Sequence, residues 1–158
     1  MSNQESVTLR QMVVDALRGH QAHIVFDSAI EDFPVEARGR KPPGAPHTPW
    51  QLLEHMRIAQ KDILEFSRDP RHKSPDWPES YWPPTEAPPS SKAWDESVHA
   101  FQKDALEFSR LVQDLQNNLF EPFEHGDGQT LLREALLLTT HNSYHLGQLV
   151  FMKKTLGG

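Results

Sequence analysis

The sequence predicts an all-α fold: a four-helix bundle in which a long crossover loop connects helices two and three. Four segments carry apolar residues at the 3.6-residue spacing of an amphipathic helix. No segment shows the alternation of apolar and polar residues that is typical of a strand. Residues 70–89, between the second and third of these segments, contain seven of the 13 prolines, which excludes a helix or a central strand there.

The first helix is expected from about Val7 to Ile30. Its apolar face includes Val13, Leu17 and Ile24, which recur near the helical period. Pro34 lies beyond its end, where a helix cannot continue. Residues 35–47 mix proline, glycine and basic residues, so we expect an ordered loop there.

The second helix has the clearest start signal in the sequence. Thr48 can cap it, Pro49 suits the first helical position, and Gln51 stands where a capping box has Glu or Gln. The helix should end before Pro70, and its apolar face carries His55.

The proline-rich segment that follows also holds Trp77, Tyr81 and Trp82. A disordered linker would be poor in aromatic residues. We therefore expect this segment to pack on the helices as a crossover connection, which helix bundles are known to contain.

The third helix is expected to begin after Ser90 or Ser91 and to stop before Pro122. Its apolar positions follow a regular spacing from Trp94 to Leu115. The fourth helix should run from about Thr130 to Leu156, with Gly157 as its C-terminal cap.

Length and composition indicate a single soluble domain over residues 1–158. The chain has a net charge of −6, which argues against a nucleic-acid partner. No run approaches the roughly 18 apolar residues of a membrane span, and no signal peptide is visible. We therefore expect a cytoplasmic protein that acts on a small-molecule substrate. The absence of cysteine means that any metal must be held by nitrogen and oxygen.

Three histidines on apolar helix faces form the candidate site. His141 and His145 are four residues apart and share one face of the fourth helix, while His55 lies on the inward face of the second. Three buried imidazoles cost free energy unless each finds a partner, and one metal ion would satisfy all three. The alternative is that they are ordinary core histidines with hydrogen-bond partners. A zinc protease is excluded because Asn142, not Glu, follows the first histidine of the pair.

Other polar residues have weaker claims to the site. His20, His23 and Asp27 could approach it from the first helix, but polar contacts at an exposed face explain them better. Tyr144 and Gln148 flank the histidine pair and could either hold a ligand ring or simply pack. Glu54 precedes His55 but should point away from it, so it is not assigned as a base. His99 is expected to be solvated. No catalytic residue and no thiol-binding residue is assigned.

Two stretches resemble the signature motifs of the DinB-like superfamily: PWQLLEH at residues 49–55 and HNSYHLGQ at residues 141–148. The resemblance covers about residues 7–156 and implies a four-helix bundle with a long crossover. It also implies a divalent metal ion, zinc or nickel, on His55, His141 and His145. Relatives in that superfamily include bacillithiol-dependent S-transferases and a mycothiol-dependent maleylpyruvate isomerase.

Three functions stay open from the sequence. The first is a metal-dependent S-transferase that uses a low-molecular-weight thiol, which must come from outside because the chain has no cysteine. The second is a metal-dependent hydrolase, and the third is a metal-binding, stress-related protein without turnover. A homodimer is compatible with aromatic residues that we expect to be exposed, Trp77 and Trp82, but no feature of the sequence requires it.

Overall fold

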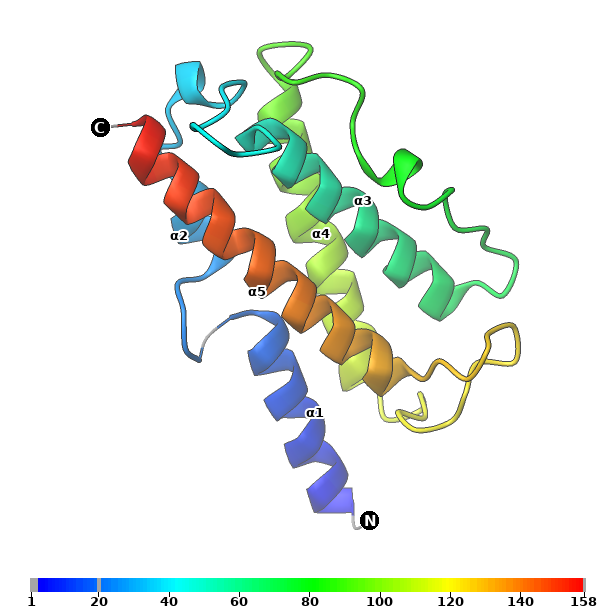
Figure 1. Cartoon of the computed structure of the whole chain (residues 1–158). Helices are drawn as coiled ribbons and strands as arrows, with labels where there is room; N and C mark the ends of the chain where they lie inside the picture. Colours follow the sequence, from blue (N-terminus) through cyan, green and yellow to red (C-terminus); the bar gives the residue numbers. More distant parts are fainter. Residues whose placement is uncertain (1–2, 20, 158) are drawn as a thin grey trace.

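The computed structural model describes residues 3–19 and 21–157, and within them the fold is all-α, as predicted. Helices α1, α3, α4 and α5 are the long elements of a helical bundle, and α2 is a single short helix (Figure 1). The helices are α1 (Asn3–Leu17), α2 (Phe26–Ile30), α3 (Pro49–Arg68), α4 (Ala93–Gln113) and α5 (Leu131–Leu156).

The expectation of one continuous first helix from Val7 to Ile30 is wrong. The chain leaves α1 after Leu17, and Gly19 has a φ of +72°, the left-handed conformation that commonly ends helices. It re-enters a helix only at Phe26. Ile24, which was expected on the buried face, lies between the two helices and is 48% exposed. His20 lies outside the described residues.

Helix α3 begins as predicted. The Oγ1 of Thr48 accepts a hydrogen bond from the backbone N–H of Gln51 at 3.1 Å, and the backbone N–H of Thr48 donates to Oε1 of Gln51 at 3.0 Å. These two bonds are the capping box, with Pro49 at the first turn. The hydroxyl of Thr48 also donates to the backbone oxygen of Glu86 at 2.6 Å. The start of α3 is thereby fastened to the crossover.

The crossover from α3 to α4 contains only a short 3-10 turn, Glu79–Tyr81, and runs back along α3 (Figure 1). Trp50 Nε1 donates to Oγ1 of Thr85 at 3.1 Å, and the Tyr81 hydroxyl donates to Oδ2 of Asp62 at 2.6 Å. The return of the chain lets α4 run in the same direction as α3, with α5 running the opposite way.

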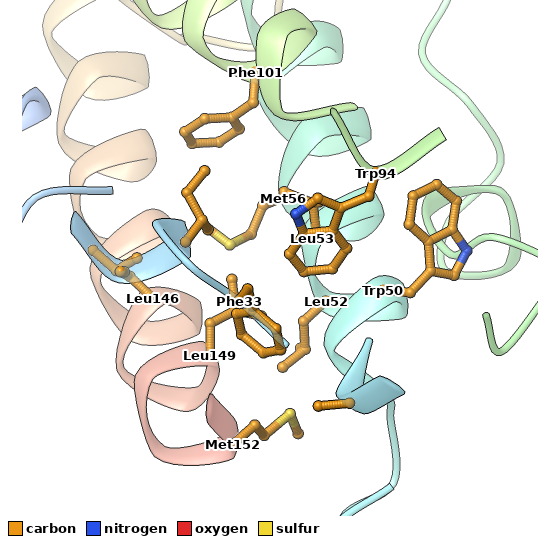
Figure 2. Packing of buried hydrophobic residues seen from close by; sticks show 13 residues of the cluster. Phe33, Trp50, Leu52, Leu53, Met56, Trp94, Phe101, Leu146, Leu149 and Met152 are labelled. Atoms are coloured by element: carbon orange, nitrogen blue, oxygen red, sulfur yellow. The ribbon is translucent and has the colours of Figure 1, made fainter. Parts of the chain in front are cut away.

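The core consists of two apolar clusters along the bundle. One of them surrounds the first half of α3, where Leu53 and Met56 are fully buried against residues of α4 and α5 such as Trp94 and Leu149 (Figure 2). The other lies along the second half of α3 and includes Leu64. His55 sits between Leu53 and Met56 in the sequence, so its backbone is anchored by the first cluster.

Candidate functional site

The structure brings together the three histidines that the sequence singled out. His55 comes from α3, and His141 and His145 come from α5. One ring nitrogen from each lies within 4.8 Å of the other two, and Nε2 of His55 is 3.1 Å from Nε2 of His141. His55 and His145 are buried, at 3% and 9% exposed, and His141 is half-buried. We call these three residues the histidine cluster.

Each imidazole of the cluster has an oxygen next to its other nitrogen. Nδ1 of His55 donates to the backbone oxygen of Tyr81 at 2.9 Å, and Nδ1 of His145 donates to Oε1 of Gln148 at 2.7 Å. Nδ1 of His141 lies 3.4 Å from Oδ1 of Asn142, a weaker contact. An acceptor at Nδ1 keeps the proton there and leaves the lone pair on Nε2. All three lone pairs are therefore available to one central atom.

Burial keeps these rings neutral near pH 7. Desolvation, together with the neighbouring His145 and His55, lowers the pKa of His141 to about 4. Desolvation also lowers the pKa of His55 and of His145, although the hydrogen bonds from Nδ1 partly oppose it. Neutral imidazole is the form that binds metal ions.

The donor set fits a divalent metal, and so does the spacing of the His55–His141 pair. Two nitrogens that bind one zinc ion at the usual bond length in tetrahedral geometry lie about 3.3 Å apart, close to the 3.1 Å between His55 and His141. Among the described residues, no carboxylate joins this group of ligand atoms. The three rings would occupy three positions and leave further positions open.

One wall of the cluster is an aromatic stack that the sequence did not reveal. Trp82 lies face to face with His55, with ring centroids 4.0 Å apart, and its ring also stacks with that of His47 at 3.8 Å. Trp82 is thus half-buried, which corrects the expectation that it is exposed; Trp77 is 71% exposed, as expected. No sequence pattern connects His47 in one loop with Trp82 in another, so only the fold could show this contact.

A hydrogen-bond chain behind His55 connects the cluster to the far part of α3. Tyr81 accepts from His55 through its backbone oxygen and donates to Asp62 through its hydroxyl. The other oxygen of Asp62 lies 2.7 Å from Nε2 of His72. Burial, together with Asp62, raises the pKa of the Tyr81 hydroxyl above its ordinary value.

The remaining candidates are placed as follows. Gln148 holds a ring of the cluster, whereas Tyr144 is 67% exposed and contacts His145 only through its ring. Nδ1 of His23 donates to the backbone oxygen of Ile24, and its Nε2 lies 2.9 Å from Oγ of Ser143, so His23 does not join the cluster.

Two acidic candidates are also excluded from the site. Asp27 accepts a hydrogen bond from Gln102, which lies on α4. Glu54 pairs with Arg57 and with the hydroxyl of Ser97, so it points away from the cluster as expected. His99 is exposed on α4, also as expected.

The fold and the cluster together define a class of protein: an all-α bundle with three convergent imidazoles, one from α3 and two from α5. The comparison with family models agrees, because the model of the DinB superfamily matches residues 18–149. The chain belongs to the DinB superfamily. No curated protein and no solved structure matches it. No helix in the described part of the chain is long and apolar enough to cross a membrane.

Proposed function

We propose that His55, His141 and His145 bind a divalent metal ion, zinc or nickel, and that the protein transfers a low-molecular-weight thiol to an electrophilic small molecule. The metal-binding part of the proposal rests on the convergence of one ring nitrogen from each histidine within 4.8 Å, with the rings of His55 and His145 held by hydrogen bonds at Nδ1. Two lone pairs only 3.1 Å apart repel each other unless a cation or a proton lies between them.

The chemistry of the donor set favours thiol transfer. A divalent ion bound only by neutral imidazoles keeps its full charge and lowers the pKa of a thiol that it binds. The chain has no cysteine, so the thiol is a second small molecule. In the overall reaction its sulfur forms a bond to an electrophilic carbon, the leaving group departs with the bonding electrons, and the thiol proton passes to solvent.

The residues around the cluster supply orientation and shielding. Tyr81 and Gln148 hold two of the rings, and Trp82 covers one face of His55. His141 is half-buried, so the cluster is reached most readily from its side. Hydrolysis is less well supported, because no carboxylate among the described residues joins the cluster to serve as a general base.

Metal binding is tested by elemental analysis of the purified wild type, His55→Ala and His99→Ala. We expect close to one equivalent of zinc or nickel in the wild type and in His99→Ala, and almost none in His55→Ala. His99 is a matched control because it is an exposed histidine on a different helix. Equal metal content in the wild type and His55→Ala would show three ordinary core histidines instead.

Transfer is tested with metal-loaded protein, a panel of low-molecular-weight thiols that includes bacillithiol, mycothiol and glutathione, and a chlorinated dinitrobenzene as acceptor. Conjugate should form faster than in the uncatalysed reaction with at least one thiol, and His145→Ala should remove the excess rate. If the loaded protein accelerates conjugation with none of the thiols, the transferase proposal fails while the metal site stands. Hydrolysis of activated esters that is lost in His145→Ala would then favour a hydrolase.

A further inference from the structure

A cavity that none of the three clustered histidines lines is formed by residues of all five helices and of the segment between α1 and α2. Its volume is about 280 Å³. Each histidine of the cluster is followed in the chain by a residue that lines this cavity: Met56, Asn142 and Leu146. Successive residues of a helix point about 100° apart, so the two sites share the same helices but open in different directions. We call this space the rear cavity.

The break between α1 and α2 opens the rear cavity. Leu17 and Gly19 line it from the end of α1, and Val25 and Phe26 line it from the start of α2. A helix that continued through this region would pass where the chain now turns aside at Gly19. The departure from the expected continuous helix therefore creates a space that a regular four-helix bundle would fill.

The inner wall is apolar and partly aromatic. The rings of Phe26 and Phe101 stack with centroids 4.1 Å apart, and Met56 and Leu146 complete the surface. Figure 2 shows Phe101, Met56 and Leu146 converging from α4, α3 and α5. A dry apolar cavity of about 150 Å³ is enough to bind benzene. A cavity of 280 Å³ has room for a two-ring molecule.

The buried polar side chains of the wall have partners within the protein, and so does the exposed carboxylate of Asp27. Gln60, which is 2% exposed, donates to the backbone oxygen of Phe101 at 2.7 Å and accepts from Asn142 at 3.0 Å. Asp27 accepts from Gln102 at 2.7 Å. Arg18 and Asp27, which line the cavity, carry opposite charges and are both exposed. Among the described residues of this wall, every buried polar side-chain atom has a hydrogen-bond partner. None of them therefore requires a charged ligand.

We propose that the rear cavity is a binding site for a neutral, largely apolar aromatic molecule of about two rings, separate from the histidine cluster. Apolar contact with Phe26, Phe101 and Met56 provides the affinity, because burial of apolar surface is favourable and directionless. The balanced charges of Arg18 and Asp27 give no preference for an anion or a cation. This site does not depend on the proposed transferase activity.

The test uses 1-fluoronaphthalene as a neutral two-ring probe, observed by fluorine NMR with the full chain. We expect saturable binding to the wild type. Ala105→Phe places a ring into the cavity from α4 and should weaken binding at least tenfold. Ala100→Phe, a half-buried alanine on the same helix that does not line the cavity, is the matched control and should bind as the wild type does.

Two further variants make the result decisive. Ala16→Phe fills the cavity from α1 and should also weaken binding at least tenfold; it replaces Ala105→Phe if that variant loses its helical circular dichroism. Trp82→Ala alters the wall of the histidine cluster at a residue that does not line the rear cavity, and it should leave probe binding unchanged. Absence of saturable binding up to the solubility of the probe overturns the proposal. Equal binding of the probe by the wild type and a folded cavity-filling variant would also overturn the proposal. Loss of probe binding in Trp82→Ala would do the same.

Discussion

Nε2 of His55 lies 3.1 Å from Nε2 of His141, although the two residues are 86 positions apart in the chain. A neutral imidazole carries one N–H and one lone pair on its two nitrogens, and the low pKa of His141 keeps its ring neutral near pH 7. When both rings hold their proton at Nδ1, the two Nε2 lone pairs face each other and repel, and a cation bound between the rings would remove that repulsion.

The free energy of unfolding of metal-free protein should fall as the pH is lowered from 7 to 5. Burial lowers the pKa of His141 to about 4, below the value of about 6.5 in the unfolded chain. Between these values the unfolded state binds a proton that the folded state does not, so acid favours unfolding. Urea unfolding followed by circular dichroism in the presence of a chelator measures this slope.

The matched comparison is His141→Asn against His99→Asn. The first should reduce the pH dependence to the part that His55 and His145 contribute, and the second should leave it as in the wild type, because His99 is exposed. The range stops at pH 5 because the salt-bridged Glu65, whose pKa is about 2, loses its contribution to stability only at lower pH. If His141→Asn keeps the wild-type slope, the lowered pKa of His141 is not a source of the pH dependence.

Gln148→Leu should weaken metal affinity by about 10- to 100-fold, the usual effect of removing the partner of a ligating imidazole. Oε1 of Gln148 accepts from Nδ1 of His145 at 2.7 Å, and leucine has no acceptor. Gln148→Glu retains an acceptor and should keep most of the affinity. Competition with a chromophoric chelator gives the dissociation constants. Equal affinities for the leucine variant and the wild type would show that this bond does not orient His145.

Nickel should quench tryptophan fluorescence mainly through Trp82. The indole of Trp82 stacks on His55 at 4.0 Å, whereas Trp77 is 71% exposed on the crossover. A titration of Trp82→Phe with nickel should show less than half of the wild-type quenching, and Trp77→Phe should show nearly all of it. The opposite ranking would mean that nickel binds elsewhere.

Tyr81→Phe should lower the free energy of unfolding by about 1–2 kcal/mol, because it removes a partly buried hydrogen bond to Asp62. The chain provides its own control, since Tyr144, its only other tyrosine, is 67% exposed. Tyr144→Phe should change stability by less than about 0.5 kcal/mol, as is usual for surface positions. Chemical denaturation of both variants measures the difference. Equal changes in the free energy of unfolding for the two variants would show that the Tyr81 hydroxyl does not anchor the crossover.

The sequence predicted most of the helical architecture because its signals are local. Thr48 and Gln51 form the expected capping box, and α5 has Thr130 as its N-cap and Gly157 as its C-cap. The first helix was misjudged because apolar spacing continued past Gly19, and a single glycine in a helical pattern does not show that it will adopt a positive φ.

The histidine cluster was predictable for the same reason: helical spacing places His141 and His145 on one face, and the bundle brings α3 to that face. Its surroundings were not. His47 and Trp82 meet through loops, and the partner of His55 is a backbone oxygen, which no side-chain pattern can indicate. That the cluster binds a metal stays a prediction.

Tyr81 gives the crossover a length requirement. Its backbone oxygen must reach His55 while its hydroxyl reaches Asp62, two turns further along α3. The stretch from the end of α3 at Arg68 back to Tyr81 therefore has to span a set distance with a set number of residues. Surface loops usually tolerate insertions. Here we expect one extra residue between 69 and 80 to break either the hydrogen bond from His55 to the Tyr81 backbone oxygen or the one from the Tyr81 hydroxyl to Asp62. The register of this segment therefore helps to set the position of the His55 ring.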